Sequence, residues 1–469
     1  MNFKKVFCLF LSVMMIITAL SASAVSAGAE TGMPGTAFGG SQPPEKPDGE
    51  APGAPQEGMG GPGSSSADID YSGAVEITSA DTQENQTYET SAEDQSALLI
   101  STAEDVNISN PTVRKSGSSD GGDSCNFYGL NAAVLVKDGS ATTITGGTIT
   151  SDADGANGIF SYGGNGGRNG AEGDGTTVIV RDTVITTSGN GSGGIMTTGG
   201  GTTYAYDLTV TTSGRSSAPI RTDRGGGTVY VDGGSYTSNG LGSPAIYSTA
   251  DITVENAVLT SNLSEGVCIE GKNSITLLNC DLTASNTKCN GNATFLDSIM
   301  IYQSMSGDAD SGTSSFTMTG GSLTSRNGHV FHVTNTNAVI NLSDVEICNE
   351  DASGVLLSVC DDGWSGAGNI ATLNADGQEL SGTILVGSNS VLTLNLTNGS
   401  SLTGSVSGEI VNANDDTVST EVGTVNVSLD STSPWSLTSD TFISSFSGDT
   451  ANISFNGYTL YVNGTAVNS

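Results

Sequence analysis

The stretch from Gly194 to Lys272 reads GIMTTGGGTTYAYDLTVTTSGRSSAPIRTDRGGGTVYVDGGSYTSNGLGSPAIYSTADITVENAVLTSNLSEGVCIEGK, and it repeats itself. Four isoleucines each open a similar short segment at a nearly constant spacing: Ile195, Ile220, Ile246 and Ile269. A Thr-Thr or Thr-Ser pair recurs in step with them, as at Thr211-Thr212 and Thr260-Ser261. Self-similarity at a period of about 20–50 residues is typical of a solenoid, in which each winding stacks on the previous one.

Each repeat contains three short segments rich in Val, Ile, Thr and Tyr, separated by Gly, Asn and Asp; one set is Thr177–Val180, Val184–Thr186 and Gly194–Met196. Such segments are typical of β-strands bounded by turns. Equivalent strands are joined by two further strands instead of a helix, so they pair in parallel at about 4.8 Å from coil to coil. The sequence therefore predicts an all-β, right-handed parallel β-helix of about ten or more coils of 22–26 residues. Insertions at 162–175 and 286–312 are expected to form loops on one face.

Composition divides the chain into three parts. Residues 1–27 combine Lys4 and Lys5, an apolar run and a Val-Ser-Ala end, which is the pattern of a secretory signal peptide. Residues 28–67 are rich in Gly and Pro with almost no aliphatic pattern, so we expect a disordered linker. Residues 68–469 form the β-helix domain, with an N-terminal cap at 68–96 and an aromatic-rich C-terminal cap at about 421–469. We expect a secreted or cell-surface protein without a transmembrane segment after signal removal.

Charge limits the partners of this protein. The chain carries 14 basic and 49 acidic residues, a net charge of −35. Nucleic acid and anionic membranes both need a basic surface, so neither is an expected partner. The acidic balance permits Ca²⁺ binding without requiring it, and no other cofactor is expected. The segment Asp152-Ala-Asp154-Gly resembles part of a Ca²⁺-binding loop but lacks the closing Glu. The preference of Asp and Gly for turns accounts for this segment equally well. Six cysteines remain after processing, and they are consistent with disulfides or with buried thiols.

The chain from about residue 96 to 448 resembles the right-handed parallel β-helices of the pectin-lyase-like superfamily, through its coil length, its three strands per coil and recurring segments such as Val258-Leu-Thr-Ser261. The segment 381–404, SGTILVGSNSVLTLNLTNGSSLTG, looks like the β-helix of secreted bacterial adhesins. Polygalacturonase-like relatives carry an Asp-Asp pair followed by Gly-His-Gly. Here Gly328-His329-Val330 precedes Asp361-Asp362, so the order is reversed and the second glycine is missing. The resemblance thus implies the fold, whereas the enzyme motifs do not match.

The repeat also predicts a site. If the four isoleucines face inward, the following residues face outward and stack one rung apart, as Met196, Arg221, Tyr247 and Glu270. Two residues further on, a second outward column holds Thr198, Asp223, Thr249 and Lys272. Aligning Gly328 with Gly266 places His332 on the same face, and extending the alignment upstream adds Phe160 and Tyr162 to it. The candidate ligand-binding residues are Phe160, Tyr162, Arg221, Asp223, Arg224, Tyr247, Glu270, Lys272 and His332.

Three interpretations of this face stay open. It is an exposed salt-bridge ladder, a carbohydrate groove, or a catalytic site in which Arg221 or His332 is the base and Asp223 or Glu270 the acid. We expect an adhesin-like, monomeric surface protein that binds glycan or protein; the alternative is a polysaccharide lyase or glycoside hydrolase. A cleft lined by Arg221, Asp223, Tyr247 and Glu270, and walled by the two insertions, would favour the enzyme.

Overall fold

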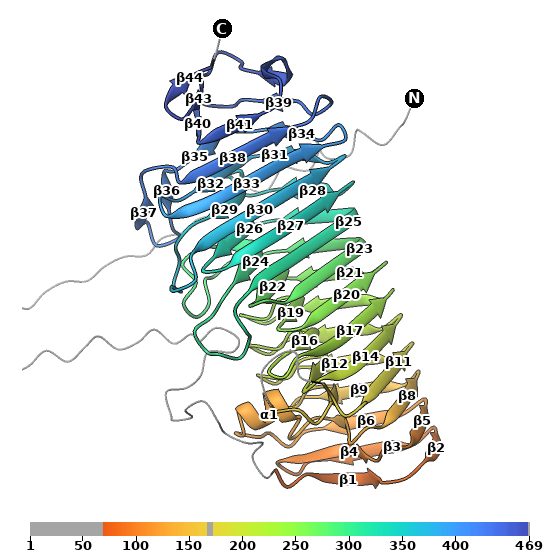
Figure 1. The fold of residues 1–469 in the computed structure, drawn as a ribbon. Coiled ribbons are helices and arrows are strands. Elements are labelled where there is room, and N and C mark those ends of the chain that lie inside the picture. The colour runs from red at the N-terminus through yellow and green to blue at the C-terminus, as the bar shows by residue number, and fades with distance from the viewer. Residues whose placement is uncertain (1–68, 167–171, 468–469) are drawn as a thin grey trace, which may run out of the picture. The chain divides into compact units, whose positions relative to one another are not determined.

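The computed structural model describes residues 69–166 and 172–467. The predicted signal peptide and linker, together with 167–171 of the first insertion, lie outside this range. The described chain is a parallel β-helix whose strands stack coil upon coil from β1 to β41 (Figure 1). One strand of each coil belongs to a 13-stranded sheet, here called sheet A: β1 (Ser72–Ile77), β4 (Gln95–Ser101), β7 (Val134–Lys137), β10 (Ile159–Tyr162), β13 (Ile195–Thr198), β16 (Ile220–Thr222), β19 (Ile246–Ser248), β22 (Val267–Glu270), β24 (Asp297–Tyr302), β26 (His329–Thr334), β29 (Val355–Val359), β32 (Thr383–Val386) and β35 (Val406–Ser407).

The other two strands of most coils belong to a 22-stranded sheet, called sheet B, and are joined by a bend. The second strands are β2 (Asp81–Glu84), β5 (Asp105–Ser109), β8 (Ala141–Thr145), β11 (Thr177–Arg181), β14 (Gly201–Tyr206), β17 (Gly227–Asp232), β20 (Asp251–Glu255), β27 (Asn337–Ser343), β30 (Asn369–Asp376), β33 (Ser390–Thr397), β38 (Thr424–Leu429) and β41 (Ser445–Ser447). The third strands are β3 (Thr87–Thr90), β6 (Thr112–Lys115), β9 (Thr148–Ser151), β12 (Val184–Thr187), β15 (Thr209–Thr212), β18 (Ser235–Ser238), β21 (Val258–Ser261) and β28 (Glu346–Asn349), while β23 (Ser274–Ala284) and β25 (Thr313–Ser325) run through both positions.

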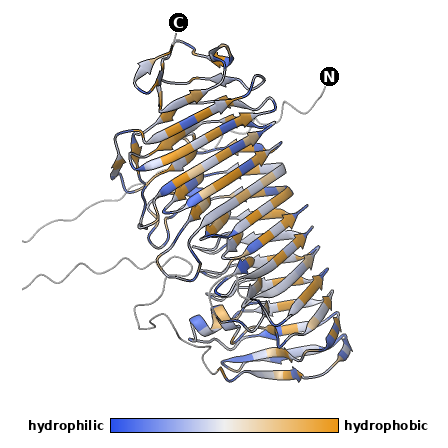
Figure 2. Cartoon of the chain, viewed as in Figure 1, coloured by the Kyte–Doolittle hydropathy of each residue, from blue (hydrophilic) through white to orange (hydrophobic). Residues whose placement is uncertain are grey.

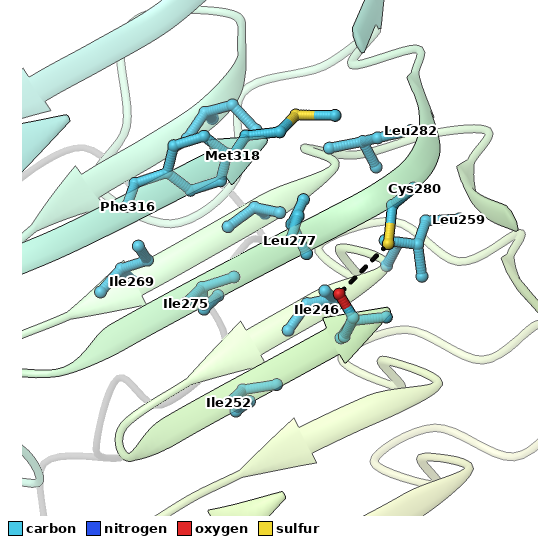
Figure 3. Close-up of a cluster of buried hydrophobic side chains, with 14 of the residues drawn as sticks. Ile246, Ile252, Leu259, Ile269, Ile275, Leu277, Cys280, Leu282, Phe316 and Met318 are labelled. Carbon is cyan, nitrogen blue, oxygen red and sulfur yellow. Dashed lines mark hydrogen bonds between the residues drawn. The ribbon is translucent and has the colours of Figure 1, made fainter. Parts of the chain in front are cut away.

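The interior of the solenoid is a continuous aliphatic core. Ile195 pairs with Ile220 and Ile220 with Ile246, and each of the three side chains is at most 1% exposed. Figure 2 shows the alternation of hydrophobic and polar residues along the strands that places one set inside. In Figure 3, Ile246, Ile252 and Ile275 fill the interior with Cys280, whose thiol contacts the Val254 carbonyl oxygen at 3.3 Å. The predicted stacking of the isoleucines is therefore confirmed for Ile195, Ile220 and Ile246.

The register differs from the prediction at the fourth isoleucine. Ile246 pairs with Val267, whereas Ile269 pairs with Ser248. This coil is shorter than the repeat predicts because the corner before β22 is tighter than its predecessors. The next coil is longer than predicted, since Val267 pairs with Ile299 and the chain between β23 and β24 forms an extended loop.

The bend between second and third strands holds a residue in the left-handed region, with φ of 50° at Asp182, 51° at Asp207 and 54° at Asn256. Short Asn and Asp side chains tolerate this region better than other non-glycine residues, which explains their recurrence there.

The corner before sheet A holds a ladder of buried serines. The Ser217 hydroxyl donates to the Gly189 carbonyl oxygen at 3.0 Å and accepts from the Ser192 backbone N–H at 2.9 Å, and the Ser217 N–H donates to the Ser243 hydroxyl at 2.8 Å. These contacts tie successive coils together where no strand pairing does so.

We expect Ser217→Ala to lower the free energy of unfolding by about 1–3 kcal/mol, because it leaves a buried N–H and a buried carbonyl without this partner. Exposed Ser213 precedes the same corner, and Ser213→Ala is the control, expected within about 0.5 kcal/mol of wild type. Chemical denaturation of both variants measures the difference. Equal free energies of unfolding for the two variants would show that the serine ladder does not contribute to stability.

Three segments differ from the sequence prediction. The predicted N-terminal cap already forms a coil, since β1 pairs with β4, β2 with β5 and β3 with β6. The predicted insertion 286–312 contains strand β24, because Ile299 and Ile301 supply inward residues between two loops. A short helix, α1 (Asp123–Tyr128), lies between β6 and β7, whereas the sequence analysis predicts an all-β chain.

The C-terminal segment closes the core with aromatic side chains and short strands. Trp435 is fully buried and its indole N–H donates to the Gly404 carbonyl oxygen at 3.1 Å. The remaining elements there are β31 (Glu379–Ser381), β34 (Ser401–Thr403), β36 (Ile410–Val411), β37 (Thr417–Ser419), β39 (Trp435–Ser436), β40 (Thr441–Ile443), η1 (Thr450–Asn452), β42 (Ile453–Ser454), β43 (Leu460–Val462) and β44 (Thr465–Ala466). In the part of the chain that the structure describes, no helix has the length and apolarity needed to cross a membrane.

Candidate functional site

The outward face of sheet A, where the sequence placed the site, is covered over much of its length by loops and by α1. Outward side chains of its strands form buried clusters with residues of the covering segments. Phe160 and Met196 pack with Phe127 of α1, and Tyr302 packs with Trp364 at a ring-centroid distance of 4.9 Å. The expectation of a solvent-facing site is therefore wrong for most of the predicted residues, since these loops make a second apolar layer outside the solenoid.

The first predicted column is present from Met196 to Tyr247. Arg221 lies opposite both Met196 and Tyr247, as expected. Because of the shorter coil, Cys268 and not Glu270 lies opposite Tyr247. The same column continues through Met300 to His332, so His332 does share a column with Tyr247.

Arg221 and Asp223 form a buried ion pair. The guanidinium donates to the Asp223 carboxylate at 2.8 Å, and the two residues are 2% and 1% exposed. A second guanidinium nitrogen donates to the Asn126 side-chain oxygen and to the Ser216 carbonyl oxygen, each at 3.2 Å. Burial raises the pKa of Asp223 to about 7, against the opposing effect of Arg221. The pair joins sheet A to the segment that carries α1.

Glu270 is buried in a ring of hydroxyl groups. Its carboxylate accepts from the Tyr247 hydroxyl at 2.6 Å, from the Tyr302 hydroxyl at 3.1 Å and from Ser306 at 3.3 Å, and it also contacts the Ser304 hydroxyl. Burial raises the pKa of Glu270, while the Ser304 and Tyr247 hydrogen bonds oppose that shift. Its acceptor sites are thus occupied by protein groups.

Two basic residues hold the 303–312 loop to the sheet. Arg224 donates to the Asp308 carboxylate at 2.5 Å, and its guanidinium carbon lies 4.3 Å from the Phe127 ring centroid. Lys272 pairs with Asp310 at 2.9 Å and its side chain is 43% exposed. Arg224 and Lys272 are the two predicted site residues that are not buried.

The remaining predicted residues belong to two other buried groups. Phe160 and Tyr162 lie in the apolar cluster under α1, where the Tyr162 ring meets the Tyr128 ring edge-on at 5.8 Å. His332 belongs to a polar cluster, with its Nδ1 atom 2.8 Å from the Ser358 hydroxyl and its Nε2 atom 3.3 Å from the Asp362 carboxylate.

The histidine cluster has the composition of a Ser-His-Asp triad but not its accessibility. The Ser358 hydroxyl also lies 2.7 Å from the His329 Nδ1 atom, and both Ser358 and His332 are fully buried. Contacts with His332, Thr294 and Gly363 hold the pKa of Asp362 below its usual value although burial alone would raise it. A nucleophilic serine must reach substrate, so this arrangement is structural in the state described.

Two surface hollows lie away from the buried ion pair and the Glu270 ring. One, of about 630 Å³, is lined by residues of β3, β6, β9 and β12, including Arg114 and Lys115. Another, of about 350 Å³, lies beside Lys272 and Thr249. Within 69–166 and 172–467, Arg221, Asp223, Tyr247 and Glu270 line neither hollow, and no group of three or more His, Cys, Asp or Glu is arranged to hold a metal ion.

The outward face of sheet B carries a feature that the sequence analysis missed. Tyr204 and Tyr206 project from β14 and Tyr230 from β17, with ring-centroid distances to Tyr230 of 6.3 Å and 6.2 Å. The Arg181 guanidinium lies 3.8 Å from the centroid of the Tyr206 ring. Tyr204 is 36% exposed. We call Arg181, Tyr204, Tyr206 and Tyr230 the tyrosine platform. The signal in the sequence was the Tyr-Ala-Tyr spacing, which in a strand turns both rings outward when Ala205 faces inward.

The platform belongs to a long polar column. The residue opposite Tyr204 on one side is Tyr230, and the column continues through Thr253, Thr276 and Thr317. Further along, amide side chains form a directional chain. The Asn341 amide donates to Thr317 at 3.1 Å, Asn374 donates to Asn341 at 2.9 Å, and Asn395 donates to Asn374 at 2.9 Å.

The comparisons with known proteins give no relative. No family model matches the chain, and neither the search of curated proteins nor the search of solved structures returns a match.

Proposed function

We propose that this chain is an exported, adhesin-like β-helix of the pectin-lyase-like class, which binds a glycan or a protein partner through the outward face of sheet B. The observation that supports it is the unbroken column of hydroxyl, amide and tyrosine side chains along that face. Neutral polar groups in register at about 4.8 Å offer a repeating set of hydrogen-bond donors and acceptors to an extended partner.

The enzyme alternative has less support. A polysaccharide lyase or hydrolase needs acid and base groups that touch the polymer. The candidates for those roles, Arg221, Asp223 and Glu270, are each at most 2% exposed, and both carboxylates accept hydrogen bonds from protein groups. We therefore place the interaction on sheet B and propose no reaction for sheet A.

We expect the purified full chain to bind a subset of a glycan and surface-protein array, and cells that lose the protein to attach less well to that ligand. An Arg221→Lys variant serves as the matched control, because it alters the buried face and leaves sheet B unchanged. Its array pattern is expected to equal that of the wild type once its folding has been checked by circular dichroism. Absence of any array signal, together with unchanged attachment of cells that lack the protein, would refute the proposal.

A further inference from the structure

We propose that the tyrosine platform is the ligand-binding centre of sheet B and that it takes an uncharged glycan chain lying along the column through Tyr204 and Tyr230. This inference rests on the proposed function and specifies its site and ligand class. Its basis is the geometry of the four side chains and the charges around them.

The platform is held in place before any ligand arrives. Arg181 and Tyr206 lie opposite each other on neighbouring strands, and the guanidinium covers one side of the Tyr206 ring at 3.8 Å. The Glu255 carboxylate of the next coil lies near the Tyr230 hydroxyl, and desolvation together with this carboxylate raises the pKa of Tyr230. Tyrosine rings fixed in this way offer rigid contact area at a low cost in side-chain entropy.

The chemistry of the platform matches a sugar ring. A tyrosine ring presents an apolar face and a polar hydroxyl, so it packs against C–H groups while hydrogen-bonding to hydroxyls. The next rungs of the same column add the Thr253 and Thr276 hydroxyls. Rings and hydroxyls one rung apart, at about 4.8 Å, suit a partner that presents C–H faces and hydroxyls in a repeating order.

The charges beside the platform select an uncharged partner. Asp232 and Glu255 follow Tyr206 in its own column, so an acidic polymer would meet like charge there. The column through Tyr204 and Tyr230 continues through the neutral residues Thr253, Thr276 and Thr317, so a chain lying along that column meets uncharged groups. The cation of the platform, Arg181, is stacked on a ring.

The test compares the full-length wild type with the double variant Tyr204→Ser/Tyr230→Ser in affinity electrophoresis. The probes are a soluble neutral β-glucan, a galactomannan, polygalacturonate and polylysine. We expect the wild type to be retarded by at least one neutral glycan, and the double variant to bind it at least ten-fold more weakly with an unchanged circular-dichroism spectrum and melting temperature. The matched control is Tyr458→Ser, which alters a tyrosine with a similar exposed fraction of 39% in the C-terminal segment and is expected to bind like the wild type.

The outcomes separate the two proposals. Undiminished neutral-glycan binding by the double variant would overturn the platform and leave the proposed function standing. Binding of polygalacturonate or polylysine in preference to the neutral glycans would overturn the assigned ligand class. If the wild type binds none of the four probes, this inference fails. If it also binds nothing on the array and cells that lack the protein attach normally, the proposed function fails with it.

Discussion

Replacing Arg221 with methionine is expected to lower the free energy of unfolding by about 3–5 kcal/mol, the usual cost of removing one partner from a buried ion pair. The loss arises because Asp223, at 1% exposure, keeps its carboxyl group in the apolar layer after its partner is gone. Arg221 also binds Asn126 and Ser216, so the contact between sheet A and the α1 segment weakens with it.

The loss is expected to depend on pH. Burial already raises the pKa of Asp223 to about 7 in the presence of Arg221, and removal of the guanidinium raises that pKa further. A carboxyl group whose folded pKa exceeds its unfolded pKa is neutral in both states at low pH. As pH rises above the unfolded value of about 3.9, both proteins lose stability because the unfolded carboxyl group ionises first. The wild type stops losing it at about pH 7, where its folded carboxyl group ionises, whereas the variant continues to lose it to higher pH. The difference from wild type should therefore be smaller at pH 5 than at pH 8.

Two further variants make the measurement specific. The double variant Arg221→Met/Asp223→Leu should recover most of the loss, since it removes both charges and leaves an apolar pair. Arg114 forms the matched surface ion pair with Glu89, with side chains 62% and 52% exposed, and Arg114→Met should change stability by at most about 1 kcal/mol. Urea denaturation at pH 5 and pH 8 provides the values. An Arg221→Met loss no larger than that of Arg114→Met would contradict the buried network.

The isoleucine repeat predicted the solenoid because the inward side chains of a parallel coil must be apolar at every winding. The same repeat could not predict the register at Val267, since the length of that coil is set by the tightness of a corner and not by the strands. Both Val267 and Ile269 face inward, so the hydrophobic pattern alone fits either alignment. The error put Glu270 opposite Tyr247, where Cys268 lies, and left Arg221 and Tyr247 where they were expected.

The burial of the predicted site could not be inferred from the strands. Alternation showed correctly that Arg221 and Tyr247 point away from the solenoid core, but whether such residues meet solvent depends on distant segments. Arg221 contacts Asn126, which lies 95 positions earlier, and Arg224 contacts Asp308, 84 positions later. No local pattern encodes such contacts. In contrast, the outward direction of Tyr204 and Tyr206 follows from their spacing alone, and the prediction missed them because it was built on the charged residues of sheet A.

Asp297 provides the second large effect, and here the substitution is expected to stabilise the protein. Asp297 opens β24, is 1% exposed, and neither of its carboxylate oxygens has a hydrogen-bond partner. Burial, then the charges of Glu265 and Asp362, raise its pKa well above the usual value. Asp297→Asn keeps the shape and removes the need to keep a proton on a buried acid, so we expect an increase of about 1–3 kcal/mol in the free energy of unfolding at pH 7.

The sign of the pH dependence distinguishes the removal of the buried acid at position 297 from a change in packing as the cause of the stabilisation. Below the unfolded pKa of about 3.9, Asp297 is protonated in both states and the variant should gain little. As pH rises from there towards the folded pKa, the unfolded wild type releases a proton that the folded protein retains, and wild-type stability falls by up to about 1.4 kcal/mol per pH unit. The gain of the variant should therefore grow from pH 4 to pH 7. Asp344→Asn is the control, because Asp344 is exposed and its φ of 55° suits asparagine equally well. A variant that is no more stable than wild type at pH 7, with the same pH profile, would contradict the expectation that Asp297 is protonated in the folded protein.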